Sequence, residues 1–478
     1  MAFTRRRLLG RAVAAAGTMG MLQAAGIYGL IDGLAMLPKR LDASGSPAHP
    51  EQHLIDGIQT ITDNNVQVLV PPLYHQVVTA RLRVPSGSSG IKGLQRALEE
   101  SLQGLDARYP NTPGGLNVVV AWGLPYFTRY VPGPWADHAP VDHRATATAG
   151  HETYALIEAI RFPSDPAGTI LEQNDLSVLF ASDSLSNIAD GAQAIFGAHG
   201  DALQVTSIRK GFVGGGFGGG QSLPKQMALA ANIPGAASIP DNAELFLGFT
   251  STQKAALGPG QIANLESLPG LTDQWPNGYF CYGTTMHLSH LFEDLEAWYS
   301  RDAKGSYANR VQRTFKPEVS VPYGTVTVPE DAGQIEDLAA VKHDATAYGL
   351  VGHSATLQPL SRLPAAVTDN HGTTYSAGTP IPQRADFDTL DNPFFDRANG
   401  YAAGLHFVVF APTSDAFHRT RMAMDGVYPD GTNLANAPYK IGPHSAGMGF
   451  NSVLSTTHRQ NYLVPPRVHR SFPMAELL

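Results

Sequence analysis

The stretch DLSVLFASDSLSNIADGAQAIFGAHGDALQVTSIR, residues 175–209, holds the pattern that decides the fold. It begins with an apolar run over 175–181, which predicts a buried strand. A helix is expected over 187–196, and residues 203–209 predict a second strand. The stretch therefore predicts a strand–helix–strand unit.

A second unit of the same kind precedes it. Residues 75–84 and 116–122 are rich in β-branched side chains and predict two strands. Between them, apolar residues recur at helical spacing: Ile91, Leu94, Leu98, Leu102 and Leu105. Two such units in succession have the element order of a ferredoxin-like fold.

The C-terminal part of the chain repeats this logic. Strands are expected at 279–286 and 404–411, and helices at 290–299 and 415–424. The predicted fold class is α+β, with two ferredoxin-like halves, antiparallel sheets and flanking helices. The predicted organisation is a signal segment at 1–40, an N-terminal half at 41–210, a glycine-rich connector at 211–240 and a C-terminal half at 241–478.

Three adjacent arginines, Arg5, Arg6 and Arg7, stand before an apolar stretch rich in alanine and glycine that runs to about residue 37. Adjacent arginines at this place are the address of the twin-arginine (Tat) export route. A permanent membrane anchor is the alternative, but Arg11 and several glycines make the stretch a weak membrane span. We therefore expect export to the periplasm, cell envelope or exterior, with membrane contact only through this segment.

The composition of the chain bears on its binding partners and on the source of its stability. The net charge of −8 argues against nucleic acid, whose phosphates attract basic proteins. Hydrophobic residues make up 43% of the chain, which is enough for a large core. The single cysteine, Cys281, excludes an intramolecular disulfide, so stability must come from the core or a bound ligand.

Six segments together resemble the dye-decolourising (DyP-type) haem peroxidases, and the resemblance covers most of residues 55–425. In chain order they are LNVVVAWGLPYF (116–127), DLSVLFASD (175–183), ELFLGFTST (244–252), GHSATLQPLSRL (352–363), IPQRADF (381–387) and GLHFVVFAP (404–412). Their shared order carries the resemblance, because each segment alone is a weak match. That family has two ferredoxin-like halves and binds haem b in the second.

The resemblance implies a site in the C-terminal half. His353 would be the axial ligand of the haem iron, and Arg384 would be the distal arginine that stabilises charge as peroxide is cleaved. The partners would be hydrogen peroxide and a small-molecule organic donor. The chain departs from the family at Ser251, which stands where the family has its distal Asp. Since serine is no carboxylate proton shuttle at neutral pH, a non-catalytic haem-binding relative is an alternative.

A serine hydrolase is a further alternative. The segment LVGHSAT (350–356) resembles a nucleophile elbow with Ser354 as the nucleophile. Asp386 or Asp388, followed by His444, would complete the chain order Ser–Asp–His. However, Thr356 replaces the last glycine of the elbow motif, and Pro359 interrupts the helix that should follow.

A metal site is a weaker hypothesis. His287, His290 and Glu293 fall at three-residue steps and would share one face of the helix expected there. The plainer interpretation is a polar helix face. The sequence leaves the oligomeric state open, a homo-oligomer included.

Overall fold

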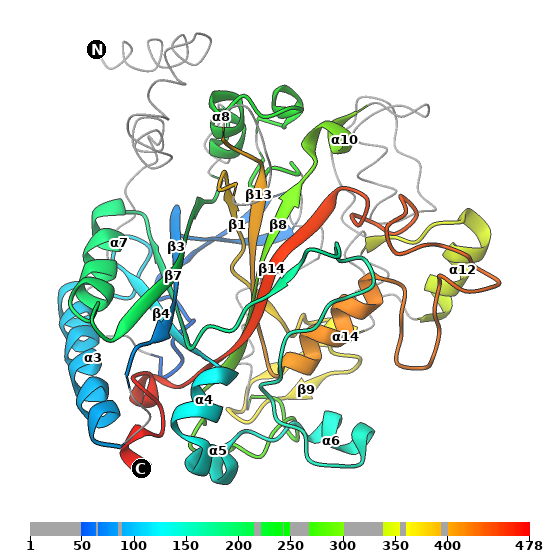
Figure 1. The fold of residues 1–478 in the computed structure, drawn as a ribbon. Helices are drawn as coiled ribbons and strands as arrows, with labels where there is room; N and C mark the ends of the chain where they lie inside the picture. The colour runs from blue at the N-terminus through cyan, green and yellow to red at the C-terminus, as the bar shows by residue number, and fades with distance from the viewer. Residues whose placement is uncertain are drawn as a thin grey trace, which may run out of the picture.

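The computed structural model describes residues 49–63, 66–84, 88–214, 221–241, 243–248, 267–300, 338–353, 360–392 and 400–478. A closed β-barrel lies at its centre, with helices around it (Figure 1). The barrel strands follow the order β13-β12-β7-β3-β6-β4-β14-β8, and β8 pairs back onto β13. Each neighbouring pair in this ring is antiparallel.

The N-terminal half contributes one side of the barrel, with its strands in the order β7-β3-β6-β4. Its elements are β3 (Tyr74–Leu82), α3 (Ser88–Arg108), β4 (Asn117–Gly123), β6 (Leu176–Ser182), α7 (Leu185–Ala192) and β7 (Leu203–Phe212). This is the predicted succession of two strand–helix–strand units, and it is confirmed.

The C-terminal half contributes the other side, in the order β12-β13-β8-β14. Its elements are β8 (Thr284–Glu293), β11 (Gln383–Arg384), β12 (Phe387–Thr389), β13 (Gly404–Ala411), α14 (Ser414–Met424) and β14 (Leu454–Val464). Taken in chain order, both halves place the first strand between the third and the fourth. The predicted α+β class with two ferredoxin-like halves is therefore confirmed.

Shorter elements surround the barrel. They are β1 (Gln59–Asp63), β2 (Val66–Val70), α4 (Leu124–Tyr130), α5 (Pro132–His138), α6 (His143–Ala149), β5 (Ile170–Leu171), α8 (Leu223–Ala230), α10 (Leu295–Tyr299), α12 (Leu338–Tyr348), β9 (Val367–Thr368) and β10 (Thr374–Tyr375).

The barrel interior is filled by side chains from both halves. Because side chains alternate across a strand, one residue in two points inward. The buried inner cluster is Val77, Val119, Ala121, Leu179, Met286, Leu288, Phe387, Val408, Phe410, Tyr462 and Val464. Helices α3 and α7 cover the outer face of the N-terminal strands (Figure 1). The apolar spacing that predicted the first helix is the face that packs there, with Leu98, Leu102 and Leu105 almost fully buried.

In the C-terminal half, the start of one predicted helix is wrong and one strand was not predicted. Residues 290–293 end strand β8, and the helix begins only at Leu295, where Asp294 caps it by accepting a hydrogen bond from Ala297 N. Strand β14 was not anticipated, because its residues Thr456–Asn461 are polar. Both strands form because β8 lies between β13 and β14 and pairs with each along its length.

Several predictions lie outside the described residues. The signal segment falls wholly in 1–48, and residues 215–220 of the glycine-rich connector are also outside them. The domain boundaries stay predictions. No helix in the described ranges is both long enough and apolar enough to cross a membrane.

Candidate functional site

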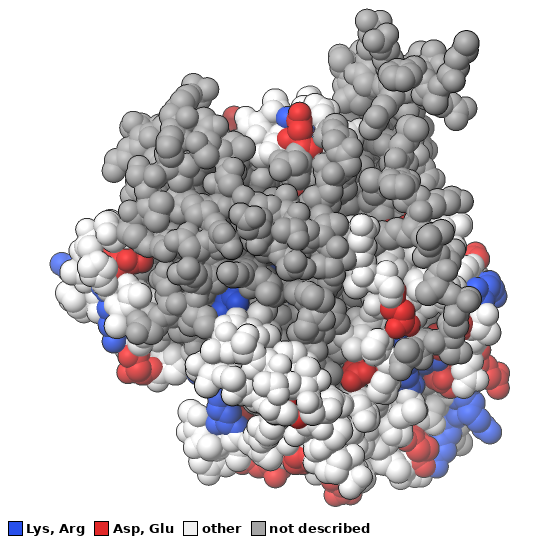
Figure 2. All heavy atoms as spheres, turned by 180° about the vertical axis from the view of Figure 1, so that it is seen from behind, with Lys and Arg blue, Asp and Glu red and all other residues white. Residues whose placement is uncertain are grey.

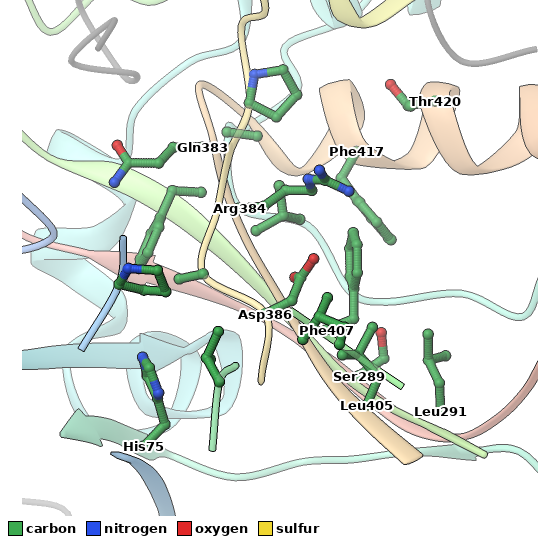
Figure 3. A pocket seen from close by; sticks show the side chains of 18 of the residues that line it. His75, Ser289, Leu291, Gln383, Arg384, Asp386, Leu405, Phe407, Phe417 and Thr420 are labelled. Atoms are coloured by element: carbon green, nitrogen blue, oxygen red, sulfur yellow. The ribbon is translucent and has the colours of Figure 1, made fainter. Parts of the chain in front are cut away.

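A cavity of about 320 Å³ is lined by the outer face of the C-terminal strands, and it also reaches His75, Val119 and Leu179 of the N-terminal strands. The outer face of the N-terminal strands is covered by helices. Helix α14 forms the opposite wall with Phe417, Thr420, Arg421 and Met424 (Figure 3). The strand side is lined by Ser289, Leu291, Glu293, Leu405, Phe407, Val409, Thr456 and Arg459. A cavity of this size with mixed apolar and polar walls is typical of a ligand site.

His353 is one lining residue of this cavity. The strand bridge between Val351 and Met448 holds its segment, as does the hydrogen bond from Val351 N to Gly447 O at 2.8 Å. Its ring meets the ring of Phe450 at a centroid distance of 4.6 Å. Burial, with smaller effects of Arg384 and Arg421, lowers the pKa of His353 to about 3, so the imidazole is neutral at ordinary pH.

Arg384 lines the same cavity from strand β11. It pairs with Val409 of β13, and Figure 3 shows its side chain leaving the strand on the opposite side from that of Gln383. The sequence assigned His353 and Arg384 to one site, and both line this cavity. Whether they bind a cofactor there is a proposal taken up below.

Asp386 lies beside Arg384 on the same side of the chain (Figure 3). It sits in an irregular step between β11 and β12, where Ala385 N donates to Val408 O at 2.8 Å and Val408 N donates to Asp386 Oδ1 at 3.0 Å. The register with β13 is the same before and after this step, so Arg384, Asp386 and Asp388 keep to one face of the chain. Burial raises the pKa of Asp386 to about 6, although Arg384 and the Val408 hydrogen bond oppose the rise.

From the sequence, Asp386 is a candidate only for the hydrolase hypothesis, although its spacing from Arg384 also indicates a shared strand face. Arg384, Asp386 and Asp388 stand two residues apart, which is the spacing of one strand face. Further along this face, burial raises the pKa of Glu293 and of Asp388. The negative charge of Asp386 also raises both pKa values, and Glu293 raises the pKa of Asp388. Both are 2% exposed or less, and a neutral carboxyl is the stable form there.

The half-buried Arg421 and the buried Arg459 stand at another part of the cavity wall. Arg421 donates to Asp425 Oδ1 and to Ser164 Oγ, both at 2.5 Å. Arg459 donates from Nη2 to Asp165 Oδ1 at 2.5 Å and is 1% exposed. Its Nε and Nη1 are buried and have no hydrogen-bond partner among the described residues. A buried guanidinium with open donors is suited to an anionic ligand group.

The proposed metal site at His287, His290 and Glu293 is wrong. These residues lie in strand β8, where His290 faces away from the other two. His287 stacks on Phe417 at 3.6 Å and bonds to Asn461 Oδ1 at 2.7 Å, while the ring of His290 meets that of His406 at 4.7 Å. Within the described residues, no group of three or more His, Cys, Asp or Glu side chains could hold a metal ion.

Ser251 and Ser354 both lie outside the described residues. The hydrolase hypothesis also requires a parallel sheet beneath the elbow, whereas the barrel strands here are antiparallel. His444, the third member of that hypothesis, is exposed and does not line the cavity.

Lysine and arginine side chains form no continuous stripe over the described part of the face in Figure 2, where acidic and basic residues are interspersed. This mixed surface agrees with the net charge of −8. The expectation that nucleic acid is not a partner stays a prediction from charge.

The chain is similar to one protein family and to several solved structures. The model of DUF7405, a family of unknown function, matches residues 72–466. No curated protein matches the chain. Among solved structures, the DyP-type peroxidase from Cellulomonas bogoriensis is similar with a TM-score of 0.50 and 16% identity, covering 88% of this chain and 96% of that one. DtpA from Streptomyces lividans, solved as an oxyferrous complex, has a TM-score of 0.51 and 16% identity, covering 88% and 94%. The fold is thus that of the DyP-type peroxidases, in a divergent sequence.

Proposed function

We propose that this chain, which belongs to the DUF7405 family of unknown function and has the fold of DyP-type peroxidases, is an exported haem b protein. In this proposal it uses hydrogen peroxide to oxidise a small organic donor. The observation that carries the proposal is that His353 and Arg384 line one cavity in the C-terminal half.

The donor set of the cavity fits a haem. A neutral imidazole such as that of His353 is a common axial ligand of haem iron. Apolar side chains would pack against the faces of a macrocycle, and Leu291, Leu405, Phe407, Phe417 and Phe450 line this cavity. The open Nε and Nη1 donors of Arg459 suit the carboxylate groups at the edge of such a ligand.

Each residue would have a limited task. A bound haem would supply the redox chemistry, by which an organic donor gives two electrons to peroxide. His353 would hold the iron from one side. Arg384 would donate hydrogen bonds to peroxide and stabilise negative charge as the O–O bond weakens. The apolar walls would limit access of water, which strengthens these electrostatic contacts.

The visible absorption spectrum of the full chain, produced with haem precursor or reconstituted with haemin, tests the proposal. We expect a Soret band in the wild type that is lost or shifted in His353→Ala, with haem affinity reduced at least about tenfold, as for loss of a metal-site interaction. His444→Ala is the matched control, since this histidine is exposed and lies outside the cavity.

A wild-type chain that stays colourless, or a His353→Ala spectrum equal to that of the wild type, would contradict the proposal. Haem binding without peroxide turnover would leave the non-catalytic haem-binding relative as the better description. The replacement of the distal Asp by Ser251 favours that second function.

Export through the Tat route is supported by Arg5–Arg7 and the apolar stretch that follows. Fractionation of host cells with and without Tat transport tests it. Protein that leaves the cytoplasm equally in both would contradict this part of the proposal.

A further inference from the structure

Peroxide chemistry at this cavity needs a group that moves a proton. Hydrogen peroxide must lose a proton from one oxygen, and a proton must reach the other oxygen before it can depart as water. Arg384 cannot do this, because a guanidinium stays protonated at neutral pH. The following inference rests on the proposed function and concerns which residue performs this transfer.

Among the described residues, three carboxylates line the cavity: Glu244, Glu293 and Asp386. Glu293 is 2% exposed, and it lies near two other carboxyl groups, Asp386 and Asp388. It is therefore held in the neutral form and cannot accept a proton. Glu244 lies on a different segment from Arg384. The backbone of that segment is held by Gly214, whose N–H donates to Glu244 O at 2.9 Å.

Asp386 has the position that the transfer needs. It stands two residues from Arg384, both residues line the cavity, and Figure 3 shows the two side chains on the same side of the chain. Val408 N holds Oδ1 at 3.0 Å, which fixes the carboxyl group. This is the hydrogen bond that the Asp386 carboxyl group accepts among the described residues, and the residue lines the cavity.

The charges around Asp386 suit a reversible proton carrier. Arg384 on its own strand favours the carboxylate, whereas Glu293 on β8 and Asp388 on β12 are acidic neighbours. Asp388 lies outside the cavity, whose other charged or titratable lining groups include Arg421 of α14, Arg459 of β14, Glu244 and His353. The resulting pKa of Asp386, about 6, leaves it ionised at neutral pH yet able to take up a proton.

We propose that Asp386 is the proton-transfer group of the cavity, in the role that Ser251 cannot fill. Its carboxylate accepts the proton of one peroxide oxygen, breaking that O–H bond and leaving the hydroperoxide anion. It then returns the proton to the oxygen that departs as water, so Asp386 ends as it began. The oxygen that remains takes two electrons and two protons from the organic donor and becomes the second water. One peroxide and one reduced donor thus give two molecules of water and one oxidised donor.

Binding of cyanide to the haem-loaded full chain tests this assignment without turnover. Hydrogen cyanide must lose its proton when it binds iron, whereas imidazole binds through a lone pair and loses none. We expect Asp386→Asn to slow cyanide association about 100-fold, the lower range for a general base, and to leave imidazole association unchanged. Asp388→Asn, which alters a neighbouring buried carboxyl outside the cavity, should keep the wild-type rate.

The pH dependence gives a second measurement. In the wild type, cyanide association should rise as the pH increases through about 6, because only the ionised carboxylate accepts a proton. In the cofactor-free protein, difference infrared spectroscopy should show a carboxyl group that titrates in the same range and is absent from Asp386→Asn. This measurement applies even if the variant binds haem poorly.

The outcomes separate the two proposals. Haem binding with equal cyanide rates in wild type and Asp386→Asn, or a wild-type rate that is flat through pH 6, overturns the role of Asp386 alone. A slow rate in Glu244→Gln with a normal rate in Asp386→Asn would assign the transfer to Glu244 and also overturn it. A chain that binds no haem overturns both proposals.

Discussion

The two halves of the barrel have the same strand order but differ on their outer faces. In the N-terminal half, the outer face is apolar, with Val118, Val120, Trp122, Val178 and Phe180 packed under helices. In the C-terminal half, the corresponding face carries charged side chains, including Arg384, Asp386 and Arg459, and it lines a cavity.

This difference shows that topology and chemistry are decided by different residues of the same strands. Inward-facing side chains of both halves form one apolar cluster, which holds the barrel closed. Outward-facing side chains pack against helices in the N-terminal half and line the cavity in the C-terminal half. The half that leaves polar groups facing a cavity carries the candidate site, because buried polar groups cost stability and tend to persist where they serve a purpose.

The largest contrast concerns aromatic side chains on the two outer faces. Trp122 is fully buried, meets Tyr126 at 4.3 Å and Phe472 at 4.9 Å, and donates from Nε1 to Arg470 O at 2.9 Å. Trp122→Ala should lower the free energy of unfolding by about 3–5 kcal/mol. Phe407→Ala, on the cavity side of β13, should cost on the order of 1 kcal/mol, since a half-buried ring loses fewer contacts. Urea denaturation measures both, and equal losses would contradict the contrast.

The second contrast concerns Asp→Asn in the two halves. The folded-state pKa of Asp386 is raised from 3.8 to about 6, so its contribution to stability is fully present below the unfolded pKa and is lost as the pH rises through 6. Asp386→Asn should therefore stabilise the protein at pH 7, by on the order of 1–3 kcal/mol, and the gain should vanish near pH 4.

The matched change in the N-terminal half should have the opposite sign. Asp175 is fully buried, pairs with Arg129 and accepts from Leu82 N at 2.8 Å. Asp175→Asn should destabilise the protein by about 1–3 kcal/mol, because it weakens charge-assisted hydrogen bonds. Thermal melts between pH 4 and 8 measure both variants. A loss of stability in Asp386→Asn at pH 7 would show that Asp386 is structural.

The smallest contrast uses glycine. Gly449 has a φ of +53°, and a Cβ there would lie 3.1 Å from His353 Cβ. Gly449→Ala should cost about 1 kcal/mol and weaken haem binding by displacing His353. Gly104 lies in helix α3 with open space around it, so Gly104→Ala should raise stability by about 0.5–1 kcal/mol with unchanged haem binding. Chemical denaturation measures the stability of the two variants, and titration with haemin measures their haem affinity. Unchanged haem affinity in Gly449→Ala would contradict the idea that Gly449 keeps His353 in place.

The N-terminal half could be predicted because the spacing of its apolar residues follows the period of a helix or a strand without interruption by polar residues. Apolar residues at helical spacing mark α3, and apolar runs mark β4 and β6, since these elements bury whole faces. The C-terminal half was harder to predict. His287, His290 and Glu293 looked like a helix face, yet they lie in a strand, because buried polar partners such as Asn461 take the place of apolar ones.

Only part of the candidate site could be predicted from the sequence. His353 and Arg384 were named from the family resemblance, and both line the cavity. Asp386 was linked to a different chemistry, because nothing local shows that it faces the same cavity as His353. Arg459 and its ion-pair partner Asp165 are far apart in the chain and meet only in the folded protein.

The sequence by itself determined the α+β class and the repeated strand–helix–strand order, since these follow from local periodicity and hydrophobic burial. The family resemblance also predicts that Ser251 stands where the DyP-type peroxidases have their distal Asp, and this stays a prediction. Only the tertiary structure decided that the two halves close one barrel and that Arg384, Asp386 and His353 line one cavity. The reason is that β8 pairs with strands on both sides and fixes which faces point outward, and this pairing depends on residues far apart in the chain.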